Sequence, residues 1–317
     1  MTVSGVFHIY HIIIASIGLI FNTWLMFLAM FKSNEKMKSY AILIFVVALT
    51  DLIGSFADLM SQTRAVSFDN GLAFINYGMC TYFGEVACKV SFVLAMGSSC
   101  NSQYLLVLSF HYRYYILRNG NPGVKVTALV VSLVTLPSVI QMILHYLGHG
   151  VSSIVIEQLQ RTRDISLDDA IVTGVTDIST AINMICSLHI SLSIFSNYLV
   201  IFILRRRIIK LLEEKTHSLS EATKHLHAQL LEVLTYQAII PMFLLIGVCS
   251  FNLGRLGFHN DILESSNVGL IMLIPVLSPL SYIIFLRTFR EYTLSVFFCK
   301  DGPRSVTERT KNSAEAK

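Results

Sequence analysis

Charged residues are scarce in this sequence of 317 residues. Asp, Glu, Lys and Arg together make up 14% of it, whereas they make up about a quarter of an ordinary soluble domain. Hydrophobic residues make up 54%. This balance excludes an ordinary soluble domain and is typical of a chain that lies mostly within a membrane.

The sequence also lacks the motifs that identify common enzymes and metal sites. It has no H-E-x-x-H motif, so a zinc protease of that type is not supported, and its six cysteines form no C-x-x-C pair. His145 and His149, four residues apart, either share a metal with a third ligand or form the solvated end of a helix. We therefore expect no enzyme activity, no cofactor and no metal centre.

Long apolar runs, by contrast, are abundant. A hydrocarbon core about 30 Å thick is crossed by about 20 apolar residues in a helix. Stretches such as AILIFVVAL do not alternate between apolar and polar residues, which argues against the strands of a membrane β-barrel. The sequence therefore predicts an all-α membrane protein with seven transmembrane helices, at residues 7–31, 40–60, 86–110, 126–147, 179–204, 234–254 and 267–286.

The positions of the cations predict how these helices are oriented. Nineteen of the 24 Lys and Arg fall in three loops, 32–39, 111–125 and 205–233, and in the tail from residue 287. Because Lys and Arg near the ends of spans are retained on the cytoplasmic side, these segments are expected to be cytoplasmic and the amino terminus extracellular. The net charge of +4 then reflects membrane orientation, and no nucleic-acid partner is predicted.

The chain is expected to divide into a helical domain and a tail. Residues 1–290 form the predicted seven-helix domain, and residues 291–317 form a cytoplasmic tail. In FREYTLSVFF, Phe289 and Tyr292 fall on one helical face, which predicts a short helix at the membrane surface before a disordered end. Cys299 follows this helix and is a candidate for lipidation.

Three charged residues lie within predicted spans: Asp51, Asp58 and Lys89. A charge within lipid is costly, so each is a candidate functional residue. Asp58 and Lys89 lie at comparable depth and are expected to form an ion pair, which either fixes two neighbouring helices or contacts a ligand. Asn22 is expected to face Asp51, in a polar network that either packs the helices or rearranges.

The third span is the most polar, and it ends next to a cluster of tyrosines. Its serines recur along one stripe of the helix, which predicts a central position surrounded by other helices. Just beyond it, Arg113 lies between Tyr112 and Tyr114. Aromatic rings and an arginine at this boundary either anchor the helix in the membrane interface or contact a partner.

Prolines are expected to bend three of the spans. Pro137 lies in the fourth span, Pro241 in the sixth, and Pro275 and Pro279 in the seventh, where Tyr282 follows. Each proline deletes one backbone hydrogen bond, so each creates a place where two packings can have similar energies.

Two cysteines, Cys80 and Cys88, flank the start of the third span. Eight residues apart on one continuous helix, they would be about 12 Å apart, too far to form a disulfide. They are therefore either two free thiols or, if Cys80 lies in a turn outside the helix, a disulfide formed in an oxidising exterior.

Several stretches carry a family resemblance: ALTDL, LTYQAIIP, PVLSPLSYIIFLRTFR, SFHYRYYIL and GMCTYFGEVAC. With them the chain resembles the nematode serpentine chemoreceptors of class delta, a branch of the Str superfamily, over nearly its whole length. The resemblance implies a GPCR-like bundle, a small environmental molecule as ligand and a heterotrimeric G protein as partner. It also implies a location in the plasma membrane of sensory cilia.

The resemblance suggests roles for individual residues as well. The Tyr112-Arg113-Tyr114 triplet takes the place of Asp-Arg-Tyr in rhodopsin-like receptors and is expected to contact the G protein. Tyrosine replaces the acid before Arg113, so the ion pair that restrains the arginine in rhodopsin-like receptors is missing. Ser278-Pro279-Leu280-Ser281-Tyr282 takes the place of their Asn-Pro-x-x-Tyr. The residues expected to form the activation switch are Asn22, Asp51, Pro241, Pro279 and Tyr282.

A ligand is expected in the extracellular half of the bundle. Depth and polarity alone select the candidate contacts Asp58, Gln62, Lys89, Ser91, His145, Asn183 and Asn252. The alternative function is a seven-helix ligand-gated channel or transporter. The predicted orientation and the lack of an internal repeat argue against that alternative.

Overall fold

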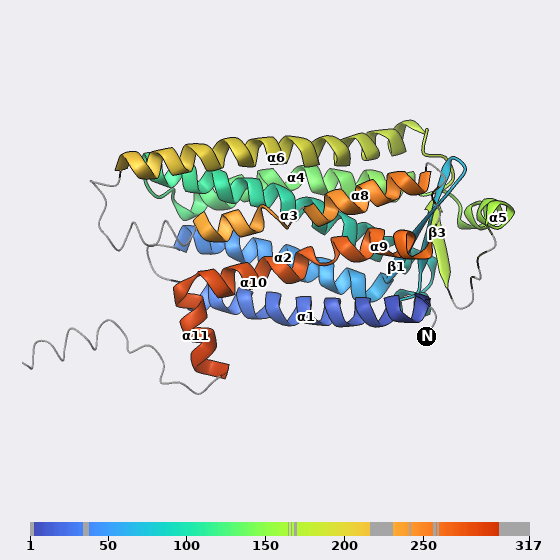
Figure 1. The fold of residues 1–317 in the computed structure, drawn as a ribbon, viewed down its shortest axis with the longest axis horizontal. Coiled ribbons are helices and arrows are strands. Elements are labelled where there is room, and N and C mark those ends of the chain that lie inside the picture. The colour runs from blue at the N-terminus through green and yellow to red at the C-terminus, as the bar shows by residue number, and fades with distance from the viewer. Residues whose placement is uncertain are drawn as a thin grey trace, which may run out of the picture.

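The protein is an elongated bundle of helices with a small sheet at one end (Figure 1). The structure, a computed structural model, describes residues 3–33, 38–163, 165, 167, 170–215, 231–240, 242–255, 258 and 260–297. The chain starts at the end that carries the sheet, and the last described helix lies at the opposite end. We refer to these as the sheet end and the α11 end.

The first five predicted spans are continuous helices: α1 (Val3–Phe31), α2 (Lys38–Ser61), α3 (Glu85–Asn119), α4 (Val124–Gly148) and α6 (Ala181–Lys215). The sixth span comprises helical residues 231–237 and α8 (Met242–Arg255). The seventh comprises α9 (Asp261–Ile271) and α10 (Ile274–Phe285). The predicted seven-helix fold is therefore confirmed, with additional secondary structure at both ends.

The third span differs from the others in what surrounds it. Among the described residues, six stretches are long and apolar enough to cross a membrane by length and composition, and α3 is not one of them. α3 packs against α2, α4 and α6 and buries many serines, together with Asn101 and Gln103. A helix enclosed by other helices meets little lipid, so its polar side chains can find partners on the surrounding helices.

The sixth and seventh spans are both interrupted near their middle. Residues 238–240 form turns before α8, and Met272 and Leu273 form a turn between α9 and α10. Pro275 lies in the first turn of α10, where its missing N–H costs little. Pro137 and Pro279 lie inside α4 and α10. Pro241 lies outside the described residues.

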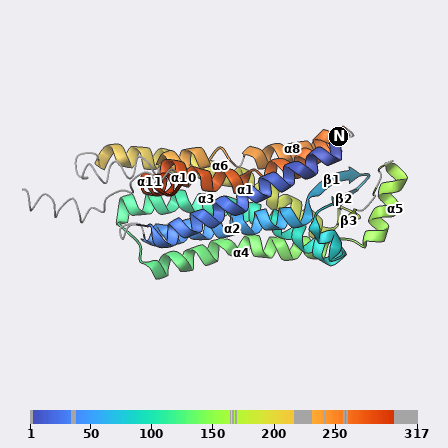
Figure 2. The same cartoon turned by 90° about the horizontal axis from the view of Figure 1, so that it is seen from below.

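The sequence predicts only loops at the sheet end, and the structure differs from this prediction. Three antiparallel strands, β1 (Thr63–Phe68), β2 (Gly71–Asn76) and β3 (Ile171–Val175), form a sheet in that order. A helix, α5 (Ser152–Thr162), packs against the sheet, and Figure 2 shows both beyond the ends of the long helices. Together they form a roof over the bundle.

Contacts to α1 fix the helix at the opposite end, α11 (Arg287–Phe297). Phe289 is buried, and the Trp24 ring of α1 stacks on Tyr292 with centroids 6.2 Å apart. The indole Nε1 of Trp24 also donates a hydrogen bond to the Thr293 hydroxyl (3.0 Å). The aromatic face expected of a surface helix therefore packs on the bundle. Cys299 lies outside the described residues.

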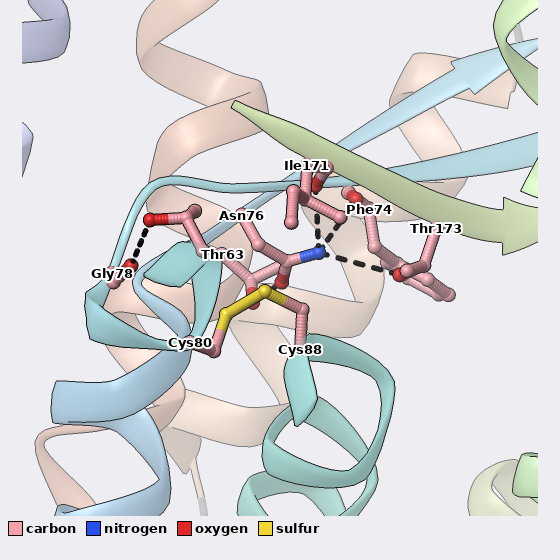
Figure 3. The surroundings of a disulfide bond; sticks show 9 residues. Thr63, Phe74, Asn76, Gly78, Cys80, Cys88, Ile171 and Thr173 are labelled. Atoms are coloured by element: carbon pink, nitrogen blue, oxygen red, sulfur yellow. Dashed lines mark hydrogen bonds between the residues drawn. A yellow bond between two sulfur atoms is a disulfide. The ribbon is translucent and has the colours of Figure 1, made fainter. Parts of the chain in front are cut away.

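A disulfide joins Cys80 and Cys88, whose Cα atoms are 4.9 Å apart (Figure 3). The bridge is possible because Cys80 lies in a short 3-10 helix, η2 (Met79–Tyr82), and the chain turns at Gly84 before α3 begins. Close by, the Asn76 amide donates to the carbonyl oxygens of Phe74 (3.0 Å) and Ile171 (3.1 Å). The disulfide thus ties the end of the roof to the start of α3.

Replacing both Cys80 and Cys88 with Ser is expected to lower the thermal unfolding temperature of the purified protein. A disulfide that closes a short loop lowers the entropy of the unfolded chain, which raises the free energy of unfolding by about 2 kcal/mol. The control is Cys249→Ser, because Cys249 is a free, exposed thiol on α8. Equal unfolding temperatures in the double variant and this control would contradict a stabilising role for the bridge.

Candidate functional site

A cavity of about 170 Å³ lies beneath the roof, between α3, α4, α6, α8 and α9. The sheet contributes Ala65, Leu72, Phe74 and Val175 to its lining, so the roof forms one wall. Most of the other lining side chains are apolar. A hollow of similar volume, about 180 Å³, lies at the α11 end between α2, α3 and α4. Because the cavity beneath the roof lies inside the bundle at the predicted extracellular end and has a mostly apolar lining, it is the candidate ligand site.

Two of the seven predicted ligand contacts, His145 and Asn183, line this cavity. The sequence analysis missed a third polar lining residue, Asn267, whose Oδ1 is buried and lacks a hydrogen-bond partner among the described residues. Next to His145, burial above all, with a smaller effect of Lys89, lowers the pKa of His149 to about 4. The His149 ring is therefore neutral at physiological pH.

Two other predicted contacts, Asp58 and Gln62, belong to a separate cluster with α1. His11 Nδ1 lies 2.9 Å from Asp58 Oδ1, and both side chains are almost fully buried. His8 Nδ1 lies 2.9 Å from Gln62 Oε1. The hollow beside these residues is only about 20 Å³, enough for about one water molecule.

The expected ion pair between Asp58 and Lys89 is wrong. Asp58 points toward α1 and pairs with His11, whereas the Lys89 ammonium lies over the Tyr146 ring of α4, 4.3 Å from its centroid. Ser91 is buried on α3, and Asn252 is exposed on α8, where its amide donates to the carbonyl of Val248. The sequence predicts how deep each of these residues lies in the membrane, but it does not predict the direction in which its side chain points around the helix.

One buried carboxylate holds the roof on the bundle. Glu264 of α9 is 2% exposed and accepts hydrogen bonds from Arg64 of β1 (2.6 Å) and from Arg163, just after α5 (2.7 Å). The two arginines come from separate segments of the roof. Glu264 lies three residues before the predicted seventh span, so it is not among the predicted intramembrane charges.

Asn22 compensates for a proline in the seventh span. Pro279 has no N–H, so the carbonyl of Pro275, four residues earlier, loses its helical donor. Asn22 Nδ2 donates to this carbonyl (2.7 Å) and to that of Gly18 (2.8 Å). The expected contact between Asn22 and Asp51 is therefore wrong, because the amide is used to join α1 to the bend in α10.

Asp51 instead contacts the central helix. The Ser102 hydroxyl of α3 donates to Asp51 Oδ1 (2.5 Å). Ser102 also lines a second, smaller hollow of about 30 Å³, together with Gln237, Ser278 and Tyr282. Gln237 Nε2 donates to the Ser281 hydroxyl (2.8 Å), which connects the sixth span to the seventh.

At the α11 end, Arg113 is buried without a carboxylate partner among the described residues. Its guanidinium carbon lies 4.7 Å from the centroid of the Tyr40 ring of α2, and the residue is 4% exposed. Tyr40 in turn stacks on Tyr112 with centroids 5.4 Å apart. Tyr40, Tyr112 and Tyr282 belong to one buried cluster, and the cation lies over the face of the Tyr40 ring.

The other two members of the predicted triplet make different contacts. The Tyr112 hydroxyl donates to Asn121 Oδ1 (3.0 Å) in the turn between α3 and α4. Tyr114 lies on another face of α3, where its hydroxyl accepts a hydrogen bond from Arg118 (3.3 Å). Tyr112 and Arg113 are thus both buried, whereas Tyr114 is only partly buried. Tyr40 was missed because it lies at the start of an unremarkable apolar run.

Replacing Asn22 with Leu is expected to lower the free energy of unfolding by about 1–3 kcal/mol, since the Pro275 carbonyl is then buried without a donor. The loss should be smaller in a Pro279→Ala background, because alanine restores the N–H that reaches this carbonyl. Thermal unfolding of the four proteins in one detergent measures this double-mutant cycle.

The matched control is Thr23→Val on the exposed face of α1, where the hydroxyl bonds only to its own helix. It should leave the unfolding temperature nearly unchanged. An equal loss on replacing Asn22 in both Pro279 backgrounds would contradict the assignment.

Comparison with known proteins agrees with this architecture. The family model described as "Serpentine type 7TM GPCR chemoreceptor Srd" matches residues 7–295. Serpentine receptor class delta-18 of Caenorhabditis elegans is 35% identical over 291 residues, covering 90% of this chain and 86% of the relative. Serpentine receptor class delta-19 of the same organism is also 35% identical, with the same coverage.

Among solved structures, squid rhodopsin superposes with a TM-score of 0.69 at 14% identity, covering 99% of this chain and 92% of rhodopsin. At this identity the match concerns the fold, and it is the fold of a seven-transmembrane receptor. The family match over nearly the whole chain goes further. The protein belongs to the serpentine class delta family of seven-transmembrane, GPCR-type chemoreceptors.

Proposed function

We propose that this receptor detects a small environmental molecule in the cavity beneath the roof and signals to a heterotrimeric G protein at the α11 end. The sheet end is then extracellular, and the α11 end is cytoplasmic. The cation distribution supports this orientation, because the loops at the α11 end and the tail hold most of the Lys and Arg. The family supports a receptor in the plasma membrane of sensory cilia.

The observation that carries this proposal is the position of the cavity beside both helix interruptions. Its lining includes Leu244, just after the interruption of the sixth span, and Ile271, the last residue before the turn between α9 and α10. A molecule in the cavity therefore contacts the two segments most able to change their direction. A ligand that fits one arrangement of these segments better shifts the population toward it.

The seventh span then transmits the change to Arg113. Below its interruption, Tyr282 lies next to the small hollow and packs in the same cluster as Tyr40. Displacement of Tyr282 into or out of this space alters the aromatic shell around Arg113. A cytoplasmic crevice opens there for the G protein, with Tyr112 and Tyr114 at its edge. Cys299 remains a candidate for lipidation beside the membrane.

Replacing Arg113 with Ala is expected to abolish signalling without reducing the amount of receptor at the cell surface. Cells that express the full chain are first screened with small molecules, using a calcium or cyclic-nucleotide readout. The variant is then tested with a compound that activates the unmodified chain. Arg118→Ala removes the same charge from the exposed end of α3 and should keep the response. A retained response in the Arg113 variant at normal surface level would exclude its role.

The orientation separates this proposal from a channel or transporter with inverted topology. Epitope tags at the two termini of the full chain, probed with antibody in intact and permeabilised cells, should show the amino terminus outside and the tail inside. An accessible tail and a protected amino terminus in intact cells would rule out the receptor orientation.

A further inference from the structure

The residues that line the cavity beneath the roof restrict the charge of the molecule that it can hold. Among the described residues that line it, none is Asp, Glu, Lys or Arg. A charged ligand would lose its hydration there without gaining an opposite charge, which is unfavourable by several kcal/mol. The occupant is therefore uncharged.

The volume of the cavity restricts the size of its occupant. An engineered apolar cavity of about 150 Å³ in another protein takes up benzene. At about 170 Å³, this cavity has room for a single ring and one or two further heavy atoms.

One polar atom selects among such molecules. The amide of Asn267 on α9 belongs to a residue that is 6% exposed, and its Oδ1 has no hydrogen-bond partner among the described residues. A buried acceptor left unpaired costs about 1–3 kcal/mol. Oδ1 has almost no accessible surface, so a donor in the cavity reaches it when the Asn267 amide turns toward the cavity, and such an occupant gains over an apolar molecule of equal shape. A hydroxyl group is the simplest uncharged donor.

The walls also indicate how such a molecule reaches the cavity. On the sheet side the roof is closed by buried side chains of the strands and held down by the two arginines on Glu264. On the lipid side, α6 packs against α3 and α4, whereas α8 packs against α9 and β1. Ser187 of α6 lines the cavity and is also exposed, and Val248 of α8 lines it while half-buried. Among the described residues, α6 and α8 make few direct contacts with each other, so the wall between them is loosely packed.

We infer that the ligand is a small uncharged alcohol or phenol with one ring, which dissolves in the bilayer, passes between α6 and α8 and donates its hydroxyl hydrogen to Asn267. This inference rests on the proposed function only in treating the cavity as the ligand site. It names the chemical class of the ligand and its route.

Three probes of similar size test the chemistry: benzyl alcohol, toluene, which lacks the hydroxyl group, and benzoate, which is charged. Thermal unfolding of the purified full chain in one detergent is measured with each probe. Benzyl alcohol should raise the unfolding temperature relative to toluene, and benzoate should have no effect. Asn267→Leu should weaken binding of benzyl alcohol about tenfold and remove its advantage over toluene.

Asn252→Leu is the matched control, because it makes the same substitution on the exposed face of α8. Effects of the probes on the detergent are common to all variants and cancel in the comparison. Equal shifts for benzyl alcohol and toluene, or an equal effect of the two Asn substitutions, would overturn the inference. The assay contains no G protein, so stabilisation without cellular signalling would count against the proposed function and leave the ligand assignment standing.

The route is tested by the time course of the cellular response to benzyl alcohol. Ser187→Trp narrows the proposed route and should slow both the onset and the decay of the response several-fold. Leu188→Trp places the same side chain at the neighbouring lipid-facing position and should change neither. An unchanged time course in the Ser187 variant, with a faster onset when the roof is loosened by Glu264→Gln, would show that the ligand arrives through the roof.

Discussion

Lipid offers no hydrogen-bond partner, and this constraint determines most of the polar contacts inside the bundle. Where a helix loses a backbone bond or carries a polar side chain, the partner has to come from another part of the protein. The seventh span shows the principle most directly. Pro279 frees the Pro275 carbonyl, and the Asn22 amide of α1 supplies the missing donor. A bend that would be unfavourable in an isolated helix is thereby kept in the folded protein.

The same constraint explains how a buried arginine is accommodated without an acid. Arg113 lies against the Tyr40 ring, and Tyr112 and Tyr282 complete an aromatic cluster. A cation over an aromatic face is stabilised by about 0.5–2 kcal/mol, which is less than in a well-formed buried ion pair. The ring carries no net charge, so no unpaired buried charge remains when the cation moves away. An arginine held in this way can leave its site at a lower free-energy cost than one paired with a carboxylate. In the proposed receptor, these tyrosine contacts restrain Arg113 in the resting state without an acid.

The sequence predicted the helices well and the partners poorly, for one physical reason. Hydrophobic runs are local, so the seven spans could be located directly, including α3, whose polarity indicated its central position. Partners are not local. Asp58 pairs with His11, 47 residues away, and Asn22 reaches a carbonyl 253 residues away. His8 and His11, three residues apart in the first span, could have indicated that this helix supplies partners for polar side chains. The Asp-Asn-Gly turn after Phe68 is typical of a hairpin and would have revealed β1 and β2.

The two ends of the bundle differ in how firmly they are held, and this difference determines which helices an occupant of the cavity can move. A disulfide, a three-stranded sheet and a carboxylate shared by two arginines fix the roof. The cavity below it is bounded on its other sides by α3, α4, α6, α8 and α9. Of these helices, α8 and α9 pack closely on each other because Gly247 leaves room for the Asn267 carbonyl. In the proposed receptor, an occupant does not displace the roof at low cost, so its volume and its hydrogen bond act on α8 and α9. Because α8 begins just after one interruption and α9 ends just before the other, the proposal has a change in their packing reach the half of the bundle that contains Tyr282 and Arg113.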